Sequence, residues 1–97
     1  MKTLQEIRRI LTEHKEELRR KYRVKEIGVF GSFVKGGQRK GSDVDILVEF
    51  EEPPSLFVFM DLEEYLSKLL GLKIDLVTKK ALKPRIGKRI LEEAVYL

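Results

Sequence analysis

The spacing of apolar residues divides this chain into alternating helical and extended segments. From Leu4 to Leu18, apolar residues recur at intervals of three and four, which predicts one helix running to about Tyr22. Thr3 and Glu6 at its start fit a capping box. Short β-type patterns predict strands at residues 25–30, 43–50 and 73–78.

The segments between these strands carry helix and turn signals. Gly31 and Ser32 end the first strand and begin a short turn or helix. After Pro53 and Pro54, Ser55 can cap a helix that runs to Leu70 and ends at Gly71. Pro84 suits the first turn of a last helix, whose inward stripe is Ile86, Ile90 and Ala94. The expected order is α-β-α-β-α-β-α, an α/β (α+β) fold with helices packed on a small sheet. We expect residues 1–97 to form a single domain.

The second strand places acidic residues on one face. Because side chains alternate along a strand, Asp43, Asp45, Leu47 and Glu49 share one face of the sheet. The Cα atoms of residues two apart lie roughly 6.5–7 Å apart, so the two aspartates can converge on one or two hard cations. Magnesium prefers oxygen ligands and usually keeps waters and substrate phosphates around it. Asp43 and Asp45 are therefore candidate magnesium ligands.

The segment between the first two strands has features of a phosphate-binding loop. Gly31 permits a sharp turn and a close approach to a ligand, and Ser32 supplies a hydroxyl. Lys35, Arg39 and Lys40 follow in a glycine-rich loop and could balance phosphate charge. The GxxxxGK[ST] pattern of a P-loop is absent.

Asp75 interrupts an otherwise apolar strand between Ile74 and Leu76. A buried, unpartnered aspartate would cost several kcal/mol, a cost that a metal ion or a cationic partner would remove. If this strand lies beside residues 43–50, Asp75 completes a cluster of three carboxylates. Purely structural roles remain open. Asp43 and Asp45 could be a solvated strand start, and Asp75 could face outward on an edge strand or pair in a salt bridge. Ser32 could be a helix cap, and the cations could belong to a solvated loop.

Together, Gly31-Ser32, a ten-residue spacer, Asp43-Val44-Asp45 and the later Asp75 resemble the DNA polymerase β type of nucleotidyltransferase. The small size and the sequence SDVDILVEF are most similar to the minimal nucleotidyltransferases of prokaryotes, many of which are antitoxin partners of HEPN-domain proteins. The resemblance covers nearly the whole chain and implies that family's fold, with a small mixed sheet of about three to four strands.

The resemblance also implies roles for individual residues. Gly31 and Ser32 would hold the β- and γ-phosphates of a nucleoside triphosphate, with Lys35 and Arg39 as further phosphate contacts. Asp43 and Asp45 would bind two magnesium ions. Asp75 would bind the metal that serves the nucleophile and accept its proton. Lys35 stands where many relatives carry arginine, so the positive charge is kept but the bidentate geometry is lost.

The implied activity is transfer of a nucleoside monophosphate, AMP from ATP, to a hydroxyl acceptor. With 97 residues, the chain has little room for its own acceptor domain. By resemblance, the acceptor is a side chain of a HEPN-type toxin, and the protein is the antitoxin of a type VII-like system. An antitoxin that neutralises its partner by binding alone is the alternative.

Charge and composition argue against several other classes of function. The net charge of +4 raises the possibility of a nucleic-acid-binding domain, but acids and bases are interspersed and no aromatic stripe accompanies them, so nucleic acid is not the expected partner. The absence of cysteine excludes disulfides and thiolate metal sites. The sequence has no apolar run of about 18 residues and no signal-peptide pattern at its start. We therefore expect a cytoplasmic protein without a membrane segment.

Overall fold

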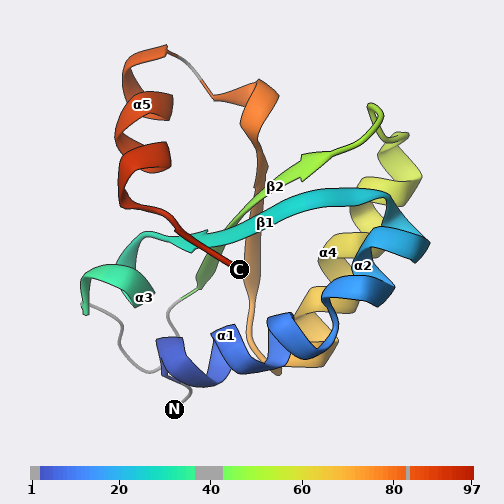
Figure 1. Ribbon diagram of the computed structural model, residues 1–97, viewed down its shortest axis with the longest axis horizontal. Helices are drawn as coiled ribbons and strands as arrows, with labels where there is room; N and C mark the ends of the chain where they lie inside the picture. The colour runs from blue at the N-terminus through green and yellow to red at the C-terminus, as the bar shows by residue number, and fades with distance from the viewer. Residues whose placement is uncertain (1–2, 37–42, 83) are drawn as a thin grey trace.

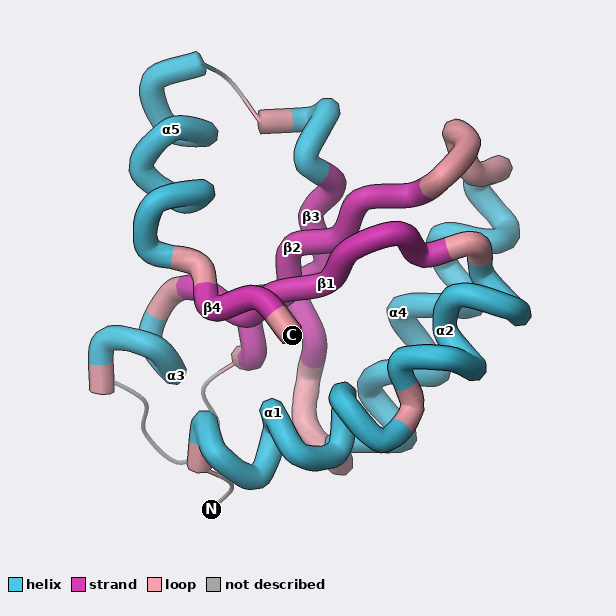
Figure 2. The backbone as a smooth tube through the Cα atoms, viewed as in Figure 1, coloured by secondary structure: helices cyan, strands magenta, loops and turns pink. Residues whose placement is uncertain are grey.

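Helices and a four-stranded sheet make up the computed structural model, which describes residues 3–36, 43–82 and 84–97, without the side chains of residues 84–86. Figure 1 shows their arrangement, and Figure 2 separates helices from strands by colour. In chain order the elements are α1 (Leu4–Glu13), α2 (Lys15–Tyr22), β1 (Val24–Phe30), α3 (Ser32–Lys35), β2 (Val44–Phe50), α4 (Leu56–Leu70), β3 (Ile74–Thr78), the 3₁₀ helix η1 (Lys79–Ala81), α5 (Pro84–Glu93) and β4 (Val95–Tyr96).

The sheet is mixed, with the strand order β3-β2-β1-β4. β1 runs antiparallel to both β2 and β4, while β2 and β3 run parallel. The parallel pair requires a crossover connection, and α4 supplies it. The expected α/β class and mixed sheet of three to four strands are confirmed.

One face of the sheet forms the hydrophobic core together with α1, α2 and α4. The inward side chains of the strands alternate with outward ones, as the sequence pattern predicts. Leu62, Leu66 and Leu70 of α4 recur at a spacing of four and are fully buried against this face. The fully buried strand residues of this core are Ile27, Val29, Val44, Ile46 and Val48.

The predicted caps of α4 are present. The Ser55 hydroxyl accepts a hydrogen bond from the backbone N–H of Val58 at 3.2 Å. Gly71 ends the helix in the left-handed conformation, with φ 67°, which glycine adopts without a steric penalty. These two residues fix where the crossover from β2 to β3 begins and ends.

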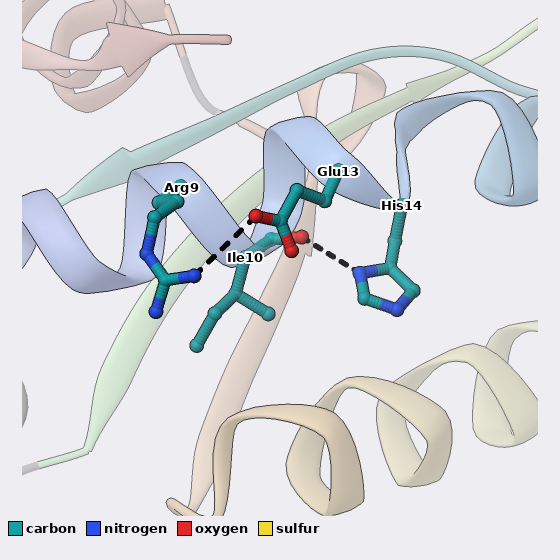
Figure 3. Close-up of polar contacts among 4 residues, drawn as sticks. All are labelled: Arg9, Ile10, Glu13 and His14. Carbon is teal, nitrogen blue, oxygen red and sulfur yellow. Dashed lines mark hydrogen bonds and ion pairs between the residues drawn. The ribbon is translucent and has the colours of Figure 1, made fainter.

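The single helix expected up to Tyr22 is wrong, because the helix breaks at His14. The backbone N–H of His14 is shared between the carbonyls of Ile10 and Leu11, each at 3.2 Å. Its ring Nδ1 lies 2.8 Å from the Ile10 carbonyl, and since a carbonyl can only accept, Nδ1 carries the proton (Figure 3). These bonds end α1, and the chain changes direction before α2 (Figure 1).

The last segment of the chain differs from the expected single helix. After β3 it forms η1, then α5, and finally the two-residue strand β4, which the pattern did not predict. β3 and β4 are the two edges of the sheet, so η1 and α5 connect opposite edges. Lys79 of η1 contacts Glu26 of β1, so the connection passes over the face opposite the core. This face is called the second face below.

Candidate active site

Asp45 and Asp75 lie side by side on the second face. They are register partners across the parallel strands β2 and β3. Neighbouring strands are about 4.8 Å apart, and register partners point to the same face, so the two carboxylates face each other directly. β3 therefore does lie beside β2, which was the condition for the predicted cluster of three carboxylates, and the structure pairs two of the three directly. Asp45 is half-buried, whereas Asp43 and Asp75 are exposed.

The environment of Asp45 disfavours its charged form. Burial, the charge and hydrogen bond of Asp75, and the charge of Asp43 together raise the pKa of Asp45 from 3.8 to about 6. A hydrogen bond from the backbone N–H of Ser32 opposes this rise. Like charges held this close cannot both ionise freely, so a bound cation would relieve a repulsion that the fold builds in.

Gly31 is the residue that lets the Gly-Ser turn reach Asp45. It has φ 76° and ψ −145°, a region that is nearly restricted to glycine. A Cβ atom at this position would overlap the Oδ2 oxygen of Asp45. Ser32 then begins α3, and the backbone N–H of Lys35 donates to the Gly31 carbonyl at 3.1 Å. Gly31 and Ser32 are thus packed directly against Asp45.

Lys35 is held by a residue that sequence reasoning missed. Its Nζ lies 3.1 Å from Oε2 of Glu93 at the end of α5. The hydrogen bond from Lys35 lowers the pKa of Glu93. The (i, i+4) spacing from Arg89 to Glu93 was visible in the sequence, but the long-range partner was not. Arg39 and Lys40, the other two expected phosphate contacts, lie outside the described residues.

The described residues do not form a closed metal cage. No group of three or more His, Cys, Asp or Glu side chains among them is close enough to hold a metal ion by itself. Two facing carboxylates, with a third acting on them electrostatically, do fit a cation that takes most of its ligands from water and phosphate. The oxygen-only donor set matches magnesium in this respect.

A second polar cluster lies on the same face. Lys79 Nζ is 2.7 Å from Oε1 of Glu26 and 5.0 Å from the ring centroid of Tyr96. The hydrogen bond to Glu26 is the main cause that raises the pKa of Lys79. The cluster joins η1, β1 and β4, so it helps to hold the connection between β3 and α5 in place. No sequence signal marks it, because it depends on the unpredicted β4.

Residues 11–97 match the model of the nucleotidyltransferase domain family. The chain belongs to this family. It is 60% identical over 97 residues to the protein adenylyltransferase MntA of Thermococcus cleftensis, covering all of this chain and 98% of that protein. The resemblance inferred from Gly31-Ser32 and the aspartates is confirmed at the family level.

Solved structures agree on the fold. A structure described as a candidate minimal nucleotidyltransferase superposes with a TM-score of 0.77 at 32% identity, covering 94% of this chain and 95% of that one. A Shewanella oneidensis complex of a tri-AMPylated HEPN toxin with its MNT antitoxin gives a TM-score of 0.66 at 17% identity, over 93% of this chain and 70% of that one. At that identity the likeness concerns the fold alone. Within the described residues, no helix is both long and apolar enough to cross a membrane.

Proposed function

We propose that this protein is a magnesium-dependent protein adenylyltransferase that transfers AMP from ATP to a hydroxyl of a HEPN-domain toxin. It would act as a single-domain cytoplasmic antitoxin of a type VII-like system. The observation that carries the proposal is the Asp45–Asp75 pair on the second face, in which Asp45 is packed against the Gly31 turn. The relative named protein adenylyltransferase MntA supports the choice of AMP as the transferred group.

The reaction joins the acceptor oxygen to the α-phosphorus of ATP and breaks the bond to the β-phosphate, so pyrophosphate leaves. Asp43, Asp45 and Asp75 would hold the magnesium ions, which would supply positive charge to the attacking and leaving oxygens. Asp75 is the more exposed member of the pair. It would face the incoming acceptor and accept the proton from the acceptor's hydroxyl group. Positioning of the two substrates accounts for much of the rate, as in other phosphoryl transfers.

Gly31, Ser32 and Lys35 bind the phosphates in this proposal, with Arg39 as a further contact. Lys35 must exchange Glu93 for a phosphate oxygen when the nucleotide enters. Both side chains are partly exposed, and an ion pair at the surface is weak because water screens it, so this exchange costs little. Glu93 therefore holds Lys35 near the site before the nucleotide binds.

The acceptor is assigned to a partner for two reasons. The second face holds the transfer residues, and the described elements make up one sheet with its helices rather than a separate substrate-binding unit. The fold is shared with the antitoxin of the Shewanella oneidensis complex, whose HEPN toxin carries AMP groups. A partner that brings its own hydroxyl side chain to the second face meets both requirements.

Transfer of label from α-³²P-ATP tests the proposal. The protein is incubated with magnesium and a purified HEPN-domain protein, and Asp43→Asn and Asp75→Asn variants are run in parallel. Glu16→Gln, an exposed substitution on α2, is the matched control. We expect label on the partner with the wild-type and control proteins only. Equal labelling by the Asp75→Asn variant, or none by the wild type, would contradict the proposal.

A survival assay separates transfer from neutralisation by binding alone. Co-expression of the partner with the Asp45→Asn variant should leave the partner toxic if AMP transfer is the mechanism. Survival equal to that with the wild type would instead support an antitoxin that acts by masking.

A further inference from the structure

The first half of α4 carries an apolar surface that the fold does not use. Four large hydrophobic side chains are exposed among those described, and three of them stand here: Leu56 at 69%, Phe57 at 78% and Met60 at 56% exposed. The opposite side of the same helix is buried through Leu62, Leu66 and Leu70. We call Leu56, Phe57 and Met60 the α4 patch. Three neighbouring side chains of this size, all outward, are typical of an interaction surface.

An acidic rim continues from the α4 patch along the same helix. Asp61, Glu63 and Glu64 follow within the next turn and are exposed. Together with Phe57 and Met60 they line a shallow groove of about 470 Å³, to which Lys73 contributes one cation. The sequence contains eight acidic residues and no Lys or Arg from residue 41 to residue 67, although the chain as a whole carries a net charge of +4.

We propose that the α4 patch and its acidic rim dock a protein helix with an apolar stripe bordered by Lys and Arg. The apolar residues would supply the buried centre of the interface, and the acidic residues would pair with the basic border. Complementary charge mainly accelerates association and fixes the register, while the apolar anchors set the lifetime of the complex. This inference rests on the proposed function only for the choice of the HEPN-domain protein as the partner to test.

A second copy of this chain fits the surface poorly. A two-fold symmetric dimer through the α4 patch would bring Asp61, Glu63 and Glu64 of one copy toward the same residues of the other, and like charges would repel. Pairing the α4 patch with the basic residues of α2 would join two different surfaces and produce an open chain of subunits rather than a closed dimer. A basic partner of another kind avoids both problems.

The α4 patch and the residues proposed to transfer AMP lie on opposite sides of the sheet. α4 lies with α1 and α2 on the core side of the sheet (Figures 1 and 2), while Asp45 and Asp75 face the other side. A partner held at α4 must therefore reach the transfer residues with a different segment. Substitutions in the patch should change the affinity for the partner and leave the rate at saturation unchanged.

Calorimetry with the purified HEPN-domain partner at two salt concentrations tests the inference. We expect Phe57→Ala and Met60→Ala each to weaken binding at least about tenfold. Alanine favours the helix, so circular dichroism should show both variants folded. Glu63→Lys should weaken binding and reduce its dependence on salt. Two controls, Leu91→Ala on α5 and Glu16→Lys on α2, should stay within about twofold of the wild type.

Labelling kinetics distinguish this inference from the proposed function. The same patch variants should raise the KM for the partner by the factor seen in calorimetry, with kcat unchanged. Binding that depends on Phe57, without any AMP transfer, would overturn the proposed function and support docking. A doubly substituted Phe57→Ala, Met60→Ala protein that binds within twofold of the wild type would overturn docking, as would no binding by the wild type. A dimer of this chain alone that Phe57→Ala abolishes would also overturn it.

Discussion

On the face of the sheet that packs against α1, α2 and α4, the inward residues of β1, β2 and β3 are apolar and buried, and they include Ile46 and Leu76. The second face of the same strands carries Asp45, Asp75 and Glu49 instead. Alternation along each strand places the acidic residues on the second face, which also carries the buried Leu47. The main hydrophobic core and the residues assigned to the reaction therefore lie on opposite faces of the same sheet.

The two faces also contribute to stability with opposite sign. Burial of apolar side chains on the core face favours folding. On the second face, the facing carboxylates of Asp45 and Asp75 oppose it whenever both are charged. A fold that keeps such a repulsion is expected at a functional site, where local stability is given up for reactivity.

The largest effect on stability should come from the core face. Leu66→Ala removes a fully buried side chain of α4 and leaves a cavity, which costs about 2–5 kcal/mol. Urea unfolding would measure this loss. At a temperature where the variant is folded, the rate of AMP transfer should remain near that of the wild type. A folded variant without activity would show that the two faces are not independent.

Gly31→Ala should affect both stability and activity through the second face. The substituted Cβ overlaps Oδ2 of Asp45, and the backbone conformation is strained for alanine. We expect a loss of about 2–3 kcal/mol and a fall in transfer rate of at least about a hundredfold. Gly36→Ala is the matched control, since Gly36 also has a positive φ, of 78°, but nothing lies within 4 Å of an added Cβ. Equal effects of the two substitutions on activity would argue against close packing of Gly31 on Asp45.

Asp45→Asn should stabilise the metal-free protein, and the gain should depend on pH. The folded-state pKa of Asp45 is raised from 3.8 to about 6, so the folded state binds more protons than the unfolded state between these values. Stability of the wild type therefore falls as the pH rises from about 4 to about 6, and the full deficit is present above pH 6.

Chemical denaturation at pH 4 and pH 7.5 with a chelator present would measure this gain. After allowance for solvent screening, we expect the variant to be about 1–2 kcal/mol more stable at pH 7.5 and nearly equal to the wild type at pH 4. Asp61→Asn, an exposed change on α4, should alter stability by less than about 0.5 kcal/mol. A gain for Asp45→Asn that is the same at both pH values would contradict the assigned cause.

The smallest expected effect concerns the link between α3 and α5. Glu93→Gln removes the charge that holds Lys35 at 3.1 Å and leaves Lys35 free to meet phosphate. We expect the KM for ATP to change by no more than about threefold, since an ion pair between exposed side chains is weak and screened by water. Steady-state kinetics would measure it, with Glu92→Gln as the neighbouring control. A loss of activity beyond a hundredfold would assign Glu93 a direct part in the reaction.

Local signals in the sequence were sufficient for much of the fold. Ser55 and Gly71 fixed both ends of α4 because capping depends only on neighbouring residues. The break at His14 was not predictable, since apolar residues keep their helical spacing across it and the competing hydrogen bonds to Ile10 and Leu11 leave no pattern. The strand β4 was missed because two residues cannot show alternation.

Some features of the candidate site could likewise be predicted from the sequence, and others could not. Asp43 and Asp45 could be placed on one face from alternation alone, and Asp75 stood out as an acid in an apolar strand. That Asp45 and Asp75 face each other depends on strand order and register, which only the structure supplies. The Lys35–Glu93 pair joins elements far apart in sequence, so no local rule could have found it.

Intact-mass spectrometry of the HEPN-domain partner tests the central claim most directly. After incubation with ATP, magnesium and the wild-type protein, the mass of the partner should rise by one or more AMP groups. The partner's mass should not change with the Asp45→Asn variant, in which the residues of the core face are unaltered. An unchanged mass with the wild-type protein, or the same increase with Asp45→Asn, would contradict the assignment of AMP transfer to the second face.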